Sequence, residues 1–162
     1  MTDLRSDGSS DMGTDLGAEA RGDFALALFV ELGRELEAAS FYAEAFGAER
    51  GEVHRVDGVP TSVEMRIGGM LIHVAGVDPA RMPAPERGGP FFPKAPGAVS
   101  TIFHLGVDNV GTAVGQAIAA GATLRDPVQN DLYGRRVASL FDPFGHVWAL
   151  VARERAGSRR AA

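Results

Sequence analysis

Residues 39–49, ASFYAEAFGAE, and residues 67–73, IGGMLIH, decide the fold, because both stretches have a counterpart later in the chain. The end of the first stretch, AFGAE, is echoed by AAGAT at residues 119–123. The second stretch is echoed by PFGHVWA at residues 143–149. Two echoes in the same order indicate an internal repeat, which means that one structural unit occurs twice.

The first copy has the pattern of a strand, a helix and three further strands. The apolar run at residues 24–30 has the length of a strand. Apolar side chains then recur at helical spacing from Leu36 to Phe46, and Gly47 stands where a helix C-cap glycine belongs. Turns at Asp57-Gly58 and Gly68-Gly69 separate predicted strands near residues 52–56, 62–67 and 70–75.

The second copy repeats this order. A strand is predicted at residues 100–107, followed by a helix that Asp108 or Asn109 caps and Gly121 ends. The apolar face of this helix consists of Val110, Ala113, Val114, Ala117 and Ile118. Further strands are predicted near residues 123–127, 136–141 and 146–151, and DPFG at residues 142–145 suits a type I turn.

Polar segments outside the two copies set the domain boundaries. Residues 1–22 are rich in Gly, Ser and Asp and predict a flexible tail, and residues 153–162 predict a short basic tail. The folded domain is then residues 23–152, with modules at 23–77 and 99–152 and a Pro-rich linker at 78–98. The linker holds the pair Phe91-Phe92, which predicts either a lid or anchor folded over the domain or a contact with a partner.

Composition excludes several classes of function. The 162 residues carry a net charge of −5, which argues against a nucleic-acid-binding surface built from clustered Lys and Arg. The absence of cysteine excludes disulfides, thiolate metal sites and a cysteine nucleophile. We find no signal peptide and no apolar run of membrane-spanning length, so a cytoplasmic protein without a membrane partner is expected. Phosphate-loop, nucleophile-elbow and zinc-protease motifs are absent from the sequence as well.

Three stretches together resemble one known family. These are residues 39–49, the YGRR run at 133–136 and DPFGHVW at 142–148. They are similar to the vicinal oxygen chelate superfamily, which contains glyoxalases, bleomycin resistance proteins and extradiol dioxygenases, and in particular to its PhnB-like branch. The resemblance covers about residues 24–152. It implies an α+β fold in which two tandem βαβββ modules form a curved eight-stranded sheet around a cavity, with the helices outside, in a homodimer.

The same resemblance implies where a metal would be held. Metal-using members carry ligands on the first and fourth strands of each module, and these positions correspond here to Ala27, His73, Ile102 and Ala149. Three of the four have no lone pair to donate, and one imidazole does not hold a divalent metal. We therefore expect no metal and no other cofactor. A two-residue shift in the second module would bring His104 to the same face, which leaves a site of His73 and His104 as an alternative.

The cavity is the expected functional site, and no catalytic residue is assigned within it. Its candidate ligand-binding residues are His73, His104, Tyr133, Arg136, Met65 and Phe103. An arginine at position 136 would hold an anionic group or pair with Asp131 or Asp142 at the surface. Glu64 and Arg66 share a strand face that lines the cavity or meets solvent.

The function predicted from the sequence is binding without catalysis. Because members of the superfamily differ in activity, the fold alone does not name a reaction. We expect metal-independent binding of a small hydrophobic or aromatic molecule, with antibiotic sequestration as one form of it. A metal-dependent lyase, isomerase or dioxygenase of the same superfamily is the alternative. The two remaining histidines, His54 and His146, are expected to be exposed and structural, respectively.

Overall fold

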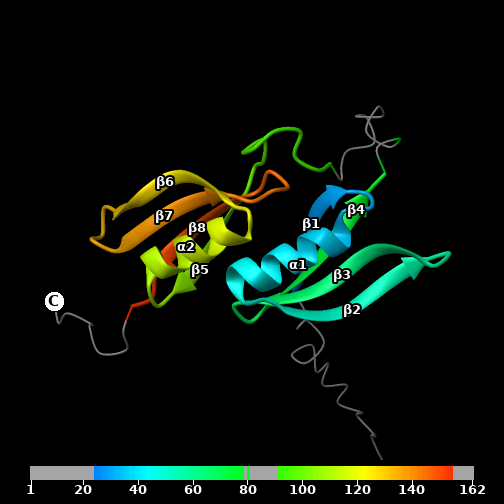
Figure 1. Cartoon of the computed structure of the whole chain (residues 1–162), viewed down its shortest axis with the longest axis horizontal. Coiled ribbons are helices and arrows are strands. Elements are labelled where there is room, and N and C mark those ends of the chain that lie inside the picture. The colour runs from blue at the N-terminus through cyan, green and yellow to red at the C-terminus, as the bar shows by residue number, and fades with distance from the viewer. Residues whose placement is uncertain (1–23, 79, 81–90, 155–162) are drawn as a thin grey trace, which may run out of the picture.

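Two copies of a β-α-β-β-β unit make up the protein (Figure 1), as seen in a computed structural model that describes residues 24–78, 80 and 91–154. The first unit consists of β1 (Leu26–Glu31), α1 (Glu35–Phe46), β2 (Glu49–Val56), β3 (Val59–Ile67) and β4 (Met70–Val77). The second consists of β5 (Ile102–Val107), α2 (Val110–Ala120), β6 (Thr123–Asn130), β7 (Arg136–Phe141) and β8 (Val147–Ala152). The predicted α+β class and tandem βαβββ order are thus confirmed. The tail predicted at 1–22, residues 81–90 of the linker and residues 155–162 lie outside the described residues.

The eight strands form two four-stranded sheets, where the resemblance implied a single eight-stranded sheet. The strand orders are β1-β4-β3-β2 in the first module and β5-β8-β7-β6 in the second. In each sheet the outer first strand is parallel to its neighbour, and the other pairs are antiparallel. Each helix packs on its own sheet, and α1 also contacts α2, so the helices meet where the modules join (Figure 1). Within the described part of the chain, no helix is both long enough and apolar enough to span a bilayer.

The helix ends agree with the capping signals of the sequence. Gly47 ends α1 in the left-handed region at φ 66°, where a side chain would be strained. The side chain of Asn109, rather than Asp108, caps α2 by accepting a hydrogen bond of 2.9 Å from the Thr112 amide. Strand β6 was predicted to end at Pro127, but it continues past this proline to Asn130. An edge strand tolerates a proline there, since no neighbour needs its missing N–H.

A buried carboxylate joins the two modules. Asp142, at the end of β7, is only 4% exposed and accepts four hydrogen bonds. Its Oδ1 accepts from the backbone amides of Phe144 and His146, both at 2.9 Å. Its Oδ2 accepts from Tyr42 Oη at 2.7 Å and from Trp148 Nε1 at 3.0 Å. Since Tyr42 belongs to α1, this one side chain ties the first module to the β7–β8 turn of the second.

Aromatic side chains surround this polar junction. The Tyr42 ring lies 5.5 Å from that of Trp148 and 6.2 Å from that of Phe144, and Phe46 lies 4.5 Å from Trp148. Such pairs add to the free energy of burial and keep water away from the carboxylate. A second polar link crosses nearby, where His146 Nε2 lies 2.9 Å from the carbonyl oxygen of Phe29 on β1. His146 is buried, which agrees with the structural role expected of it.

Substituting Asp142→Asn will lower the free energy of unfolding by about 3 kcal/mol, because an NH₂ group then replaces one acceptor oxygen and faces partners that are themselves donors. Urea unfolding followed by the fluorescence of Trp148, the single tryptophan, measures the change. Asp108→Asn is the matched control, since that exposed carboxylate forms only a 3.5 Å surface pair with Arg153. Equal stability of the two variants would contradict a central role for Asp142.

The alkaline limit of stability depends on Tyr42. Burial raises the pKa of the Tyr42 hydroxyl well above its ordinary value of 10, and the charge of Asp142 and its hydrogen bond raise that pKa further. An unfolded chain releases this proton near pH 10, whereas the folded chain keeps it, so the stability that Tyr42 contributes is present below pH 10 and is lost as pH rises above it. Urea titrations from pH 9 to 11 will therefore show a steeper loss for the wild type than for Tyr42→Phe. Tyr133→Phe, in an exposed turn, will follow the wild type.

Candidate functional site

An apolar pocket of about 450 Å³ lies between the two modules. The first module contributes Leu26 of β1 and Ile72 of β4, which are directly paired in the parallel ladder. The second module contributes Phe103 of β5 and Trp148 of β8, which are also paired, with their rings stacked 4.7 Å apart. Further apolar side chains complete the walls, namely Phe24, Ile67, Met70, Ile102 and Leu105.

Two ionisable side chains stand in this apolar pocket, beside the hydroxyl group of Thr101. His104 lies on β5 and is exposed, and Arg153 follows β8 directly. Arg153 Nε donates a hydrogen bond of 3.0 Å to the carbonyl oxygen of Gly106, which holds the arginine against β5. A side chain at Gly106 would crowd the arginine, because an added Cβ would lie 3.2 Å from Arg153 Cγ. One imidazole and one guanidinium therefore meet a ligand that enters here.

The strand ladders correct one position inferred from the sequence. In the first module Ala27 pairs with His73, which agrees with the two ligand positions that the resemblance implied there. In the second module Ala149 pairs with His104, whereas Ile102 pairs with Val147. His104 thus holds in β5 the place that Ala27 holds in β1, and the assignment of Ile102 was wrong by two residues. The error arose because the distance from strand to helix differs between the modules.

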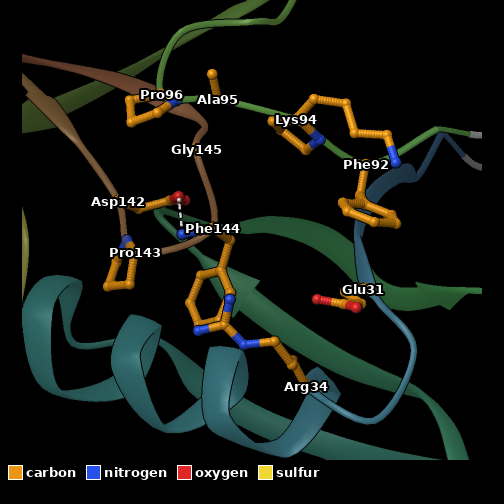
Figure 2. A pocket seen from close by; sticks show the side chains of 11 residues that line it. Glu31, Arg34, Phe92, Lys94, Ala95, Pro96, Asp142, Pro143, Phe144 and Gly145 are labelled. Carbon is orange, nitrogen blue, oxygen red and sulfur yellow. Dashed lines mark hydrogen bonds between the residues drawn. The ribbon is translucent and has the colours of Figure 1, made fainter.

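A second pocket, of about 260 Å³, lies beside the β7–β8 turn (Figure 2). Charged side chains surround it, in contrast to the pocket between the modules. The Arg34 guanidinium lies 4.6 Å from the centre of the Phe144 ring, and Lys94 Nζ lies 4.6 Å from that of Phe92. Glu31 faces both cations across the opening (Figure 2). These opposite charges balance one another, so the pocket has no clear preference for the sign of a ligand.

The linker phenylalanines lie against the folded domain. Phe91 and Phe92 share a pocket of about 320 Å³ with Ala27 and Phe29 of β1. This placement favours a segment folded back over the domain, one of the two alternatives that the sequence left open. Phe91 keeps 42% of its surface exposed, so a further contact with a partner is still a prediction.

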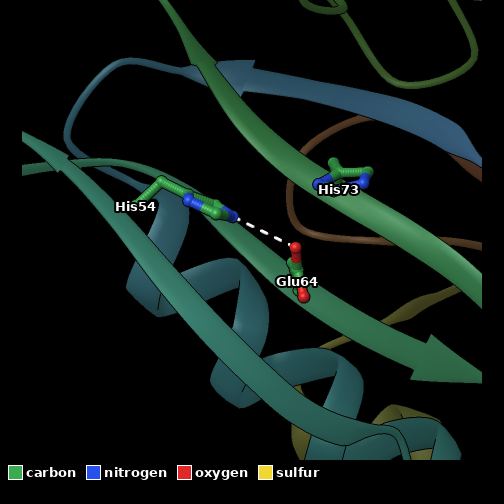
Figure 3. A group of neighbouring side chains, drawn as sticks. All are labelled: His54, Glu64 and His73. Atoms are coloured by element: carbon green, nitrogen blue, oxygen red, sulfur yellow. Dashed lines mark hydrogen bonds and ion pairs between the residues drawn. The ribbon is translucent and has the colours of Figure 1, made fainter.

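The open face of the first sheet brings together three side chains that the sequence did not connect (Figure 3). His73 of β4 lies beside Glu64 of β3 and His54 of β2, with one donor atom from each within 4.8 Å of the others. His54 had been expected to be merely exposed, and His73 to be the one donor among the four positions inferred from the family. Only the pairing of three neighbouring strands reveals this group, because the strand register decides which side chains meet on one face.

The ligand-binding residues predicted from the sequence lie in different parts of the structure. Phe103 and His104 line the pocket between the modules. Met65 does not, since it is 0% exposed on the helix side of its sheet. Tyr133 is 84% exposed in the β6–β7 turn, where Asp131 binds Arg135 at 2.8 Å. The arginine in this ion pair is Arg135, not the predicted Arg136. Neither Tyr133 nor Arg136 is among the residues that line the pocket between the modules.

The sequence analysis also missed a pocket residue. Arg153 was assigned to a basic tail beginning at that position, so its proximity to β5 was not foreseen. The one available signal was its place directly after an apolar strand, where a long side chain folds back along the edge.

Comparisons with known proteins agree with the fold. A family model described as Glyoxalase/Bleomycin resistance protein/Dioxygenase superfamily matches residues 36–150. The uncharacterised protein Mb0911c of Mycobacterium bovis is 32% identical over 114 residues, which cover 70% of this chain and 72% of that protein. TioX from Micromonospora sp. ML1 has a TM-score of 0.59 at 19% identity, covering 82% of this chain and 100% of that one. The fosfomycin resistance protein FosX from Listeria monocytogenes, in complex with Mn(II) and sulfate, has a TM-score of 0.60 at 15% identity, covering 82% and 90%.

Proposed function

The chain belongs to the Glyoxalase/Bleomycin resistance protein/Dioxygenase superfamily, and we propose that it is a cytoplasmic protein that binds a small hydrophobic or aromatic molecule between its modules. The observation that carries this proposal is the pocket of about 450 Å³ with mainly aromatic and aliphatic walls and two ionisable side chains. Pockets for small molecules have this size and this lining. The ending DPFGHVW at residues 142–148 supports a place in the PhnB-like branch.

The ladder positions favour binding without a metal. At the two paired positions, His73 lies opposite Ala27 and His104 lies opposite Ala149, so each sheet offers one imidazole and one methyl group. Among the described residues that line the pocket, His104 is the single side chain of a type that commonly holds a divalent metal, and such an ion is generally held by three or more. We therefore assign the pocket to sequestration of a ligand rather than to metal-assisted chemistry.

The lining indicates the chemistry of the ligand. A planar apolar ring fits against Phe103 and Trp148, which already stack on each other. An acidic or hydrogen-bond-accepting group on the same molecule would meet Arg153 and His104. The best ligands will thus be aromatic acids or antibiotics that carry an aromatic ring and one anionic group.

Binding of such ligands will quench Trp148, because the only tryptophan of the chain lines the pocket. A panel of aromatic carboxylic acids and aromatic antibiotics, titrated against the protein with and without EDTA, will contain ligands that quench and raise the melting temperature equally in both conditions. Met70→Arg places a charge on the 45% exposed rim and will weaken binding about tenfold or more. Val59→Arg, a 55% exposed apolar position of the same sheet outside the pocket lining, is the matched control.

Two results would contradict the proposal. A panel in which no compound quenches Trp148 or stabilises the fold would remove the evidence for a ligand site. Binding that EDTA abolishes would replace metal-independent sequestration with the metal-dependent alternative.

We also propose that the protein is a homodimer formed across the rim of this pocket. Three of the apolar side chains at the pocket are strongly exposed in the single chain: Phe24, Met70 and Ile102. Ile102 lies on β5, an edge strand paired only with β8, so a second copy that covers this rim would bury exposed apolar surface.

Light scattering after size exclusion will give twice the mass of the chain for the wild type and a lower mass for Ile102→Glu. The mass of Met70→Arg, measured alongside, separates an effect on ligand binding from an effect on assembly. A monomeric wild type at micromolar concentration would refute the dimer and leave the pocket proposal intact.

A further inference from the structure

Three strands of the first sheet place two imidazoles on either side of one carboxylate (Figure 3). Glu64 lies on β3, the strand between β2 and β4, and pairs directly with His73 of β4. His54 approaches from β2, and its Nε2 lies 3.1 Å from Glu64 Oε1. The rings of His54 and His73 stand 6.4 Å apart, so the three side chains converge above one patch of the sheet.

The pairing of β2 with β3 is irregular on both sides of His54. The β2–β3 pairing shifts register between Arg50 and Val53 and again between His54 and Arg55. Such irregularities turn a side chain away from the direction that a regular strand would give it, and they are common beside functional sites. Gly51 lies within the first shift, and an added Cβ there would meet Glu64 Cβ at 3.1 Å. The glycine therefore leaves room for the Glu64 side chain.

A carboxylate next to the first histidine completes the arrangement. Glu52 Oε1 lies 4.0 Å from His54 Nδ1, on the side of the ring away from Glu64. A carboxylate hydrogen-bonded to the distal nitrogen is the usual outer partner of a metal-bound histidine, and Glu52, beyond hydrogen-bonding distance here, lies on the side of the ring where such a partner would act. His54 Nε2 is thereby left to face Glu64 and His73.

We propose that His54, Glu64 and His73 bind one divalent transition-metal ion of the zinc type. Two neutral imidazoles and one carboxylate are donors that zinc and its neighbours in the first transition row prefer, whereas the hard ions Ca²⁺ and Mg²⁺ prefer oxygen donors alone. The donor atoms lie within 4.8 Å of one another, and small rotations bring them to the roughly 3.3 Å separation that Zn–ligand distances near 2 Å require. All three side chains reach solvent, so at least one coordination position stays open for water or an exogenous ligand.

This site is independent of the pocket between the modules. Ile72 lines the pocket and His73 follows it on β4, so the strand pleat points the two side chains to opposite faces of the sheet. None of the three proposed ligands is among the residues that line that pocket. Metal binding here and ligand binding there can therefore succeed or fail separately.

Zinc titration of the tag-free protein in competition with a chromophoric chelator will show one Zn²⁺ per chain. Glu64→Gln, His54→Ala and His73→Ala will each weaken binding at least hundredfold, since removing a direct ligand exceeds the 10- to 100-fold loss typical of an outer partner. His104→Ala, an exposed histidine of the other sheet, is the matched control and will bind as the wild type does. Urea unfolding of each variant checks that the fold is kept.

A spectroscopic measurement tests the ligand set without reference to activity. Co²⁺ bound to the wild type will give visible bands of low-coordinate cobalt with nitrogen ligands, and these bands will be lost in His54→Ala and His73→Ala. Absence of tight stoichiometric Zn²⁺ binding would overturn the proposal, as would loss of binding in His104→Ala with retention in His54→Ala. Quenching of Trp148 by pocket ligands will be unchanged in Glu64→Gln, which distinguishes failure of this site from failure of the pocket.

Discussion

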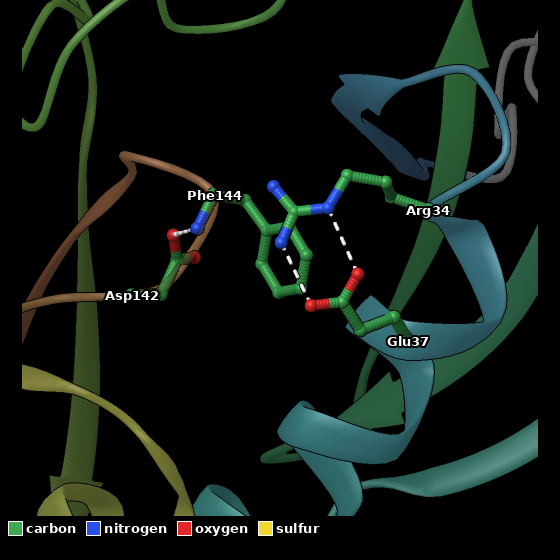
Figure 4. A network of polar contacts seen from close by, with 4 residues as sticks. All are labelled: Arg34, Glu37, Asp142 and Phe144. Atoms are coloured by element: carbon green, nitrogen blue, oxygen red, sulfur yellow. Dashed lines mark hydrogen bonds and ion pairs between the residues drawn. The ribbon is translucent and has the colours of Figure 1, made fainter.

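The buried carboxylate of Asp142 is the constraint on which the arrangement of the two modules depends. A desolvated charge is tolerated only when donors surround it, and here two amides, a hydroxyl and an indole do so. Satisfying it fixes the β7–β8 turn and, through Tyr42, the position of α1. The turn then places the Phe144 ring under the guanidinium of Arg34, which Glu37 holds from the other side at 2.7 and 2.8 Å (Figure 4).

The junction at Asp142 also positions one wall of the candidate pocket. Trp148 donates its indole N–H to Asp142, and the ring stacks on Phe103 at 4.7 Å. The direction of the indole is therefore set on one side by a buried charge and on the other by the pocket wall. Because the same ring also packs on Phe46 of α1, the pocket cannot change its aromatic wall without disturbing the contact between the modules. Rigid walls of this kind suit a site that binds a ligand without large rearrangement.

Local signals in the sequence were sufficient for the fold but not for the sites. The repeat is visible in the sequence itself, and the C-cap at Gly47 and a cap at Asp108 or Asn109 follow from short-range chemistry; the structure confirms the C-cap and selects Asn109. Asp142 was recognised as a turn residue and as a possible surface partner of Arg136, but not as a buried junction, since Tyr42 lies 100 positions away. The grouping of His54, Glu64 and His73 depends on two register shifts in β2, which no local pattern encodes. Fold and site thus differ in how far apart in the chain their determining contacts lie.

The two proposed sites depend on one strand register. In β4, Ile72 is buried toward α1 and the pocket, and His73 points to the open face. A slip of one residue would exchange these faces, bury an imidazole in the core and expose an isoleucine. Two features hold the register. The Gly68-Gly69 turn takes φ angles of 55° and 86°, and at the far end Gly76 leaves room for the buried Glu35 side chain, which any added Cβ would strike. These three glycines, two before β4 and one near its end, therefore help to keep both the pocket and the histidine group in place.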